Sequence, residues 1–408
     1  MIVAPRGRRT RGHGEGSVRT IGVVLLAVVL VLLAAVGAGG WHFADEIRDQ
    51  ALVAAPPGAP EYRIRVLAAG AGTVTLARDA TTPRELTLGG VWGLAWPGGY
   101  GQAGAIAGLG QDRVVRAFTA LRGAPPRPGE RVALDGFAFP GDPHSGLGLR
   151  FQEVRYASDV GAVPAWYVAG TRRTWVLFVH GYNAERREAL RLLRPVAAAG
   201  WPALVLAYRN DPGAPAGAPG RDRLRRWGQS EWRDLEGAVS YALAHGATGV
   251  VLVGYSMGGA IVAAFLERSR LSGRVRGAVL DAPVLRLAAL IDHGARDRTL
   301  PLVGLPIPPT LVWAARRIAQ ARFGVDWAAL DYLGRADRLH TPILLFQGTA
   351  DDRVPVALAD RLASARPDLV TYRRVEGAGH VESWNLDPAR YERAALGFLE
   401  RVAQPGAG

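Results

Sequence analysis

The chain has 408 residues, 49% of them hydrophobic and 21% charged, which predicts a folded protein with one large domain and a smaller one. The absence of cysteine excludes disulfides, thiolate metal sites and a cysteine nucleophile. The absence of lysine excludes a Walker-type phosphate loop and Schiff-base chemistry. The formal net charge is +13, but beyond the N-terminus the arginines are interspersed with carboxylates and no nucleic-acid-binding motif is present, so we expect no nucleic-acid partner.

The first forty residues have the pattern of a membrane-targeting segment. Residues 1–20 contain five arginines and one glutamate, and residues 21–41 contain no charge. About 20 apolar residues are needed to cross a bilayer as a helix, and a basic flank stays in the cytoplasm. We therefore predict a cytoplasmic tail at 1–20, a transmembrane signal anchor at 21–41 and an extracytoplasmic remainder. A signal peptide cleaved at residues 36–38, which would give a secreted protein, and a buried core helix are the alternatives.

The next hundred residues are expected to hold a stalk and a small β-rich domain. Residues 42–60 resemble a stalk, and residues 61–148 alternate in polarity between turns that are rich in glycine and proline. The clearest predicted strands are Tyr62–Val66, Thr73–Leu76 and Arg131–Leu134. His144 is expected to be a turn residue, because no second ligand lies at metal-binding spacing.

Residues 149–403 alternate between short apolar runs and amphipathic stretches. Runs that are apolar on both faces are typical of buried parallel strands. The predicted strands are Thr174–Val179, Ala203–Ala207, Gly249–Val253, Gly277–Leu280 and Pro342–Phe346. Helical stripes occupy 184–199, 231–245 and 388–402, the last with Asp387 as its cap. The fold class that this alternation predicts is α/β, with a doubly wound and mostly parallel sheet.

The pentapeptide Gly254-Tyr255-Ser256-Met257-Gly258 joins a predicted buried strand to a predicted helix. This context is the one that a nucleophile elbow needs. Side chains two positions before and after the serine would collide in so tight a turn, which explains Gly254 and Gly258. Ser256 is therefore the candidate nucleophile, at the N-terminus of a helix.

A serine nucleophile needs a base and a carboxylate that orients the base. Asp351 follows a predicted strand, and His380 follows a loop of small residues after the next strand. The chain order Ser256, Asp351, His380 is the order expected for this fold. Asp352 and Asp281 are less favoured candidates for the acid.

Two backbone N–H groups must bind the oxyanion. The sequence predicts those of Met257, after the nucleophile, and Tyr182, in the loop after the first long strand. Asn183 is expected to cap the following helix, and His180 is expected to be structural. Asn210 and Asp211 follow another strand, where a turn role is favoured over a place at the pocket rim.

Residues 180–183, 254–259, 348–351 and 377–380 together resemble the motifs of the α/β-hydrolase superfamily. The resemblance covers about residues 150–402 and is greatest to bacterial esterase- and peptidase-type serine hydrolases, some of them membrane-anchored. It implies that Ser256 is the nucleophile, His380 the general base and Asp351 its orienting acid, with the N–H groups of Tyr182 and Met257 as the oxyanion hole. It also implies that no metal or cofactor is needed.

An insertion at about 284–340 is expected to form a cap, which lines an acyl pocket or only packs against the domain. The predicted function is hydrolysis of carboxylic esters or related acyl bonds outside the membrane. The expected partners are a small-molecule or lipid acyl substrate and the membrane. An acyltransferase, a serine peptidase and an inactive envelope binding protein remain the alternatives.

Overall fold

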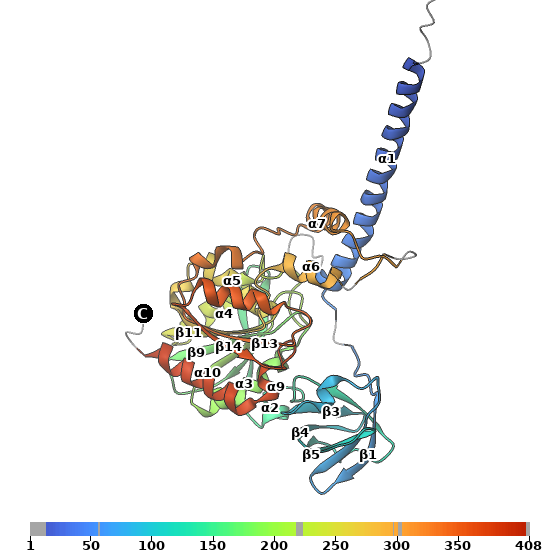
Figure 1. The fold of residues 1–408 in the computed structure, drawn as a ribbon. Coiled ribbons are helices and arrows are strands. Elements are labelled where there is room, and N and C mark those ends of the chain that lie inside the picture. Colours follow the sequence, from blue (N-terminus) through green and yellow to red (C-terminus); the bar gives the residue numbers. More distant parts are fainter. Residues whose placement is uncertain (1–13, 56–57, 218–222, 297, 301–303, 405–408) are drawn as a thin grey trace, which may run out of the picture. The chain divides into compact units, whose positions relative to one another are not determined.

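The computed structural model describes residues 14–55, 58–217, 223–296, 298–300 and 304–404 (Figure 1). The chain divides into two compact units. The helical unit comprises the residues up to Ala51 together with 295–325, and the main unit comprises 52–294 and 326–408. Residues 1–13, which include most of the predicted basic tail, lie outside the described part.

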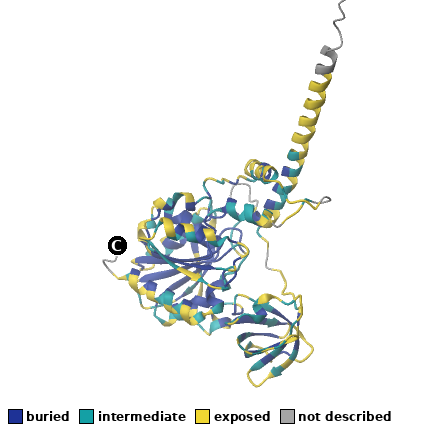
Figure 2. Cartoon of the chain, in the orientation of Figure 1, coloured by how far each residue is buried: buried dark blue, intermediate teal, exposed yellow. Residues whose placement is uncertain are grey.

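The helical unit is built on the long helix α1 (Gly14–Ile47), which continues as a π-helical turn over Arg48–Leu52. In the described part of the chain, Thr20–Leu52 is the one stretch long and apolar enough to cross a membrane, with a mean hydropathy of 3.1. No residue of the apolar window is buried, and Figure 2 shows most of α1 as exposed. The expected stalk at 42–60 therefore begins as helix, because α1 does not end at residue 41.

Helix α7 (Pro309–Phe323) comes from the insertion after the fourth parallel strand and packs on α1. The two backbones approach closely at Gly40, because this residue has no side chain. A Cβ there would lie 2.8 Å from that of Ala314. Arg322 pairs with Asp45 over 2.9 Å. Part of the predicted cap thus belongs to the helical unit, whereas residues 301–303 of its proline-rich segment lie outside the described residues.

The main unit begins with a closed six-stranded barrel of antiparallel neighbours in the order β1-β2-β5-β4-β3-β6. Its core is aliphatic and aromatic and includes the fully buried Val74, Leu76 and Leu94. Closure between β1 and β6 pairs Ile64 with Val132 and leaves no open edge there. The strands are β1 (Ile64–Gly70), β2 (Thr73–Ala77), β3 (Trp92–Trp96), β4 (Gly99–Leu109), β5 (Arg113–Arg122) and β6 (Arg131–Asp135). The β-rich segment predicted from the sequence is this barrel.

The second half of the main unit is an eight-stranded sheet in the order β14-β13-β12-β11-β9-β10-β8-β7. The first six strands in this order are parallel, and β8 and β7 continue the sheet antiparallel. The strands are β7 (Gln152–Ser158), β8 (Gly161–Val168), β9 (Thr174–Val179), β10 (Ala203–Leu206), β11 (Gly249–Tyr255), β12 (Val275–Asp281), β13 (Ile343–Gly348) and β14 (Val370–Val375). Every residue of β9, β10, β11 and β13 is buried, as expected for the centre of an α/β sheet.

Helices cover both faces of this sheet. The pair α3 (Leu190–Ala198) and α10 (Pro388–Ala403) packs together, as does the pair α4 (Trp232–Ala244) and α5 (Met257–Arg268) (Figure 1). Asp387 caps α10 by accepting from the N–H of Arg390 over 2.9 Å, as the sequence predicted. The remaining helices are α2 (Pro143–Leu147), α6 (Leu287–Arg296), α8 (Val356–Ala365) and α9 (Ser383–Leu386). His144 is exposed within α2.

Candidate active site

Ser256 lies in the turn between β11 and α5, with φ of 50° and ψ of −113°. This positive φ is unfavourable for a residue with a side chain, and the surrounding glycines make the turn possible. A Cβ at Gly254 would lie 2.8 Å from the main chain of Gly258, and one at Gly258 would overlap with the main-chain oxygen of Val179. The strained serine therefore stands at the carboxyl end of the sheet, on the first turn of a helix.

His380 brings the three predicted residues together. Its Nε2 lies 2.8 Å from the Oγ of Ser256, and its Nδ1 lies 2.9 Å from Oδ2 of Asp351. Ser256 and Asp351 are each 8% exposed, and the imidazole is 13% exposed. An imidazole held in this way can accept the serine proton on one nitrogen while the carboxylate fixes the other.

Asp351 accepts four hydrogen bonds in all. Besides His380, Gln347 donates from Nε2 over 2.8 Å, and the N–H groups of Arg353 and Val354 each donate over 2.9 Å. Burial alone would raise the pKa of Asp351, but the hydrogen bond and charge of His380 and the two N–H donors leave the pKa below its ordinary value. The carboxylate is therefore stabilised in its ionised form. Gln347, at the end of β13, is a supporting residue that the sequence motifs did not indicate.

The two less favoured carboxylates do not take this position. Asp352 is exposed, and its main-chain oxygen accepts from Nε2 of His293 over 3.2 Å. Asp281, at the end of β12, accepts from the hydroxyl of Ser383 over 3.0 Å. Burial raises the pKa of Asp281 to about 6. Of the three carboxylates weighed from the sequence, only Asp351 forms a hydrogen bond with His380 in the described structure.

The loop after β9 approaches the serine closely, since a Cβ at Gly181 would lie 3.2 Å from that of Ser256. The N–H of Gly181 donates to Oε2 of Glu188 over 2.8 Å. Within the described residues, the N–H groups of Tyr182 and Met257 donate to no acceptor outside regular secondary structure. The loop is thus near enough to Ser256 to supply the second oxyanion donor that we expect from Tyr182.

The expected helix cap at Asn183 is wrong. Asn183 has φ of 49°, and its side chain accepts from the N–H of Ala55 over 3.1 Å. The 3₁₀ turn that precedes α3 starts after Glu185 instead, without a side-chain cap. Asn183 therefore binds the backbone of the segment around Ala55, 128 positions earlier in the chain, and local sequence patterns could not indicate this contact.

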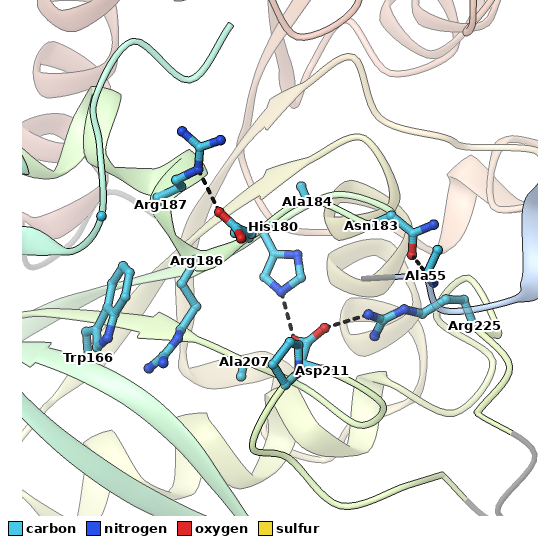
Figure 3. Close-up of a pocket in the computed structure, with 13 residues that line it drawn as sticks. Ala55, Trp166, His180, Asn183, Ala184, Arg186, Arg187, Ala207, Asp211 and Arg225 are labelled. Atoms are coloured by element: carbon cyan, nitrogen blue, oxygen red, sulfur yellow. Dashed lines mark hydrogen bonds and ion pairs between the residues drawn. The ribbon is translucent and has the colours of Figure 1, made fainter. Parts of the chain in front are cut away.

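A cavity of about 280 Å³ lies beside this loop, lined among others by Trp166, His180, Asp211 and Arg225 (Figure 3). His180 Nε2 lies 2.8 Å from Oδ2 of Asp211, and Arg225 donates to Oδ1 over 2.6 Å. Burial opposes ionisation of Asp211, but His180 and Arg225 hold its pKa below the ordinary value. His180 and Asp211 thus form a buried network beneath the loop, and none of Ser256, Asp351 and His380 lines this cavity.

A second buried pair, Glu188 and Arg191, supports both loops of the site. The carboxylate of Glu188 holds Gly181, and Arg191 donates to the main-chain oxygen of Val381, directly after His380, over 2.8 Å. Sequence reasoning missed this pair. Its only local signal is a spacing of three residues at the start of a helix, which usually indicates an exposed ion pair.

The described residues contain no group of three or more histidine, aspartate or glutamate side chains arranged to hold a metal ion.

Residues 176–394 match the profile of the family described as "Alpha/beta hydrolase family". Residues 65–135, which contain most of the barrel, match a domain of unknown function (DUF8805). No curated protein matches the chain.

Several solved structures are similar to this chain at low identity. An esterase from Pyrococcus furiosus is 18% identical, with 64% of this chain and 96% of that chain covered and a TM-score of 0.49. An esterase from Thermogutta terrifontis is 19% identical, with 62% and 100% covered and a TM-score of 0.44. A puromycin-hydrolysing peptidase from Mycobacterium tuberculosis is 18% identical, with 80% and 46% covered and a TM-score of 0.48. Similarities at this level do not specify an activity or a substrate.

Proposed function

Because the chain belongs to the alpha/beta hydrolase family, we propose that it is a serine hydrolase that cleaves carboxylic esters or related acyl bonds. The observation that carries this proposal is the position of His380, with one nitrogen 2.8 Å from Ser256 and the other 2.9 Å from Asp351. The strained backbone of Ser256 adds support, because such strain is retained where function requires it.

In this mechanism, Oγ of Ser256 attacks the carbonyl carbon of the substrate while Nε2 of His380 takes the hydroxyl proton. The N–H groups of Tyr182 and Met257 bind the resulting oxyanion. His380 then gives the proton to the departing alcohol, which leaves an acyl-enzyme. Water attacks the acyl carbon, His380 takes its proton, and Ser256 leaves with that proton as the acid is released. Asp351 stays ionised throughout and orients the imidazole.

We further propose that α1 anchors the enzyme in the membrane, with the main unit on the extracytoplasmic side. The support is the exposed apolar surface of α1 and the arginines that precede it in the sequence. A cleaved signal sequence is the alternative, and the N-terminal sequence of the mature protein separates the two. A start at residue 1 or 2 is expected, and a start near residue 39 would refute the anchor.

The test of the chemistry is labelling of the full chain, in detergent, with a fluorophosphonate probe that reacts with activated serines. Labelling is expected in the wild type and is expected to be lost in Ser256→Ala and His380→Ala. Ser269→Ala is a matched control, because Ser269 is also buried and, in the described structure, its hydrogen bonds join Glu236 and neighbours within four residues in the chain. A folded wild type that remains unlabelled, or labelling that survives Ser256→Ala, would overturn the proposal.

Ester cleavage is separated from peptide cleavage and acyl transfer by product analysis. Paired ester and amide substrates with the same acyl group are offered, with and without an added alcohol or amine acceptor. Release of free acid from the ester is the expected result. Dominant transfer to the acceptor, or faster cleavage of the amide, would favour an acyltransferase or a peptidase that uses the same residues.

A further inference from the structure

The barrel contacts the polypeptide loop that carries His380. We propose that the barrel is a positioning element of the active site: its segment 84–91, between β2 and β3, holds the 377–386 loop so that the imidazole faces Ser256. This inference rests on the role of His380 proposed above, and it gives a function to the barrel itself.

The first contact is an ion pair between Arg84 of the barrel and Glu382, two residues after His380. Nη2 of Arg84 lies 2.7 Å from Oε2 of Glu382, and Nη1 donates to the main-chain oxygen of Gly377 over 3.2 Å. The same carboxylate oxygen accepts the N–H of Gly379 over 2.7 Å. Arg84 and Glu382 together therefore hold the loop on both sides of His380, at Gly377 and Gly379 before it and at Glu382 after it. Charge-assisted and shared hydrogen bonds of this kind fix geometry more strongly than neutral ones.

The second contact is a set of hydrogen bonds that the main chain and side chain of Asn385 form with the barrel. Asn385 is fully buried. The N–H of Val91 donates to the main-chain oxygen of Asn385 over 2.8 Å, and Nδ2 of Asn385 donates to the oxygens of Val91 and Gly136 over 2.9 Å each. Gly90, with φ of +86°, allows this approach, because a Cβ there would overlap with the oxygen of Asn385. The barrel thus bonds both to the backbone and to the side chain of the loop at Asn385.

The barrel side of the contact is held rigid by Arg116 of β5, which is fully buried. In the described structure its guanidinium donates to main-chain oxygens, over distances of 2.8 to 3.3 Å. Its acceptors are the main-chain oxygens of Glu85, Leu86, Leu88, Gly90 and Gly104. Burial lowers the pKa of Arg116 to about 10, so the group stays charged at neutral pH. A buried cation bound to four carbonyls of the segment 84–91 stabilises the conformation that the segment has here.

The loop is held from the other side by α3. Arg191 donates to the oxygen of Val381 over 2.8 Å and to Oδ1 of Asn385 over 3.0 Å. The barrel and α3 therefore both bond to Asn385, and α3 also bonds to Val381, the residue next to His380. Reaction rates fall steeply when reacting groups are displaced by about 1 Å, so loss of the barrel contact is expected to slow the chemistry.

The experiment compares Arg84→Gln with Arg84→Lys, which keeps a cation near Glu382, and with Arg113→Gln. Arg113 is the matched control, since it is an exposed arginine of the same barrel whose ion pair, among the residues that the structure describes, is with the adjacent Asp112. Two quantities are measured on the full chain in detergent. These are hydrogen exchange of the amides in 377–386 and the rate constant of fluorophosphonate labelling.

Arg84→Gln is expected to increase exchange in 377–386 and to slow labelling by about 10- to 100-fold. With an ester substrate, kcat should fall while KM stays within about twofold, because the substrate itself is not contacted. Arg84→Lys should restore part of the rate, and Arg113→Gln should match the wild type. Glu382→Gln approaches the same contact from the other side and should reproduce the Arg84→Gln result.

Unchanged hydrogen exchange of residues 377–386 in both Arg84→Gln and Glu382→Gln would overturn the inference. Faster exchange in these variants with an unchanged labelling rate would also overturn it. These failures leave the proposed function intact, because the wild type would still label at Ser256. A wild type that is not labelled at Ser256 would instead refute the proposed function, and with it the role of the barrel in catalysis.

Discussion

The guanidinium of Arg191 lies 2.8 Å from the main-chain oxygen of Val381, the residue next to His380. Arg191 also pairs with Glu188 at 3.5 Å, and Glu188 accepts the N–H of Gly181 beside Ser256. One buried ion pair thus connects the loop of the candidate base with the loop of the candidate oxyanion hole. Neither member contacts the reacting atoms, so both are positioning residues.

Arg191→Met should leave Glu188 as an unpaired buried charge. Breaking such a pair typically costs about 3 to 5 kcal/mol of folding stability, whereas removing both charges is far less harmful. We therefore expect Arg191→Met to lower the thermal midpoint strongly, and Arg191→Met with Glu188→Gln to recover much of it. Labelling of Ser256 should remain slow in the double variant, because Val381 and Gly181 would still lack their charged partners. Full recovery of labelling together with stability would show that the pair is only structural.

Asp351→Asn tests the orienting carboxylate. Asparagine can keep the shape of the site, but it favours the wrong imidazole tautomer and cannot stabilise the imidazolium. The expected result is a fall in kcat of about 10⁴-fold with little change in KM. Asp352→Asn is the matched control, since Asp352 is adjacent but exposed. Equal losses in the two variants would argue against a specific role for Asp351.

Asp281→Asn should change how stability depends on pH. Because burial raises the pKa of Asp281 to about 6, the native state binds this proton more tightly than the unfolded chain does. The wild type therefore loses stability as the pH rises from about 4 through 6, as this carboxyl ionises in its buried position. The variant has no such ionisation.

The gain from Asp281→Asn, relative to the wild type, should grow by about 1 kcal/mol between pH 5 and pH 8. Because the unfolding entropy grows with chain length, that corresponds to about 1 to 2 °C in the thermal midpoint of this 408-residue chain. Thermal melts of both proteins at the two pH values give the comparison. A gain that is equal at pH 5 and pH 8, or larger at pH 5, would contradict the raised pKa.

The predicted fold class is confirmed. It could be predicted because the sequence signals for it are local. Runs such as Thr174–Val179 are apolar on both faces and coincide with central strands of the sheet. The elbow at Ser256 could be predicted since Gly254 and Gly258 report on steric crowding within five residues. The structure brings Ser256, Asp351 and His380 together in the predicted arrangement, and their catalytic roles stay a prediction.

The supporting contacts could not be predicted, because they join residues far apart in the chain. Arg84 and Glu382 are separated by 298 positions, and Arg191 and Val381 by 190. In a sequence with 49 basic side chains, nothing distinguishes a buried arginine from an exposed one. The partner of an arginine is set by the packing of whole elements, as for Arg116, whose acceptors are all backbone carbonyls. The packing of α7 on α1 is another contact between distant elements that could not be predicted. The sequence placed α7 within the expected cap.

The packing of α7 on α1 can be tested by cross-linking, because the chain has no cysteine of its own. A Cβ at Gly39 would lie 3.0 Å from Cδ2 and 3.9 Å from Cγ of Leu311. Cysteines at facing positions this close can form a disulfide without large backbone movement. Gly39→Cys with Leu311→Cys is therefore expected to cross-link within one chain on mild oxidation, detected as a linked peptide pair by mass spectrometry. Gly37→Cys with Leu311→Cys is the control, because a Cβ at Gly37 would have no neighbour within 4 Å. Equal cross-linking of both pairs would indicate a loose association, and absence of the first cross-link would contradict the packing of α7 on α1.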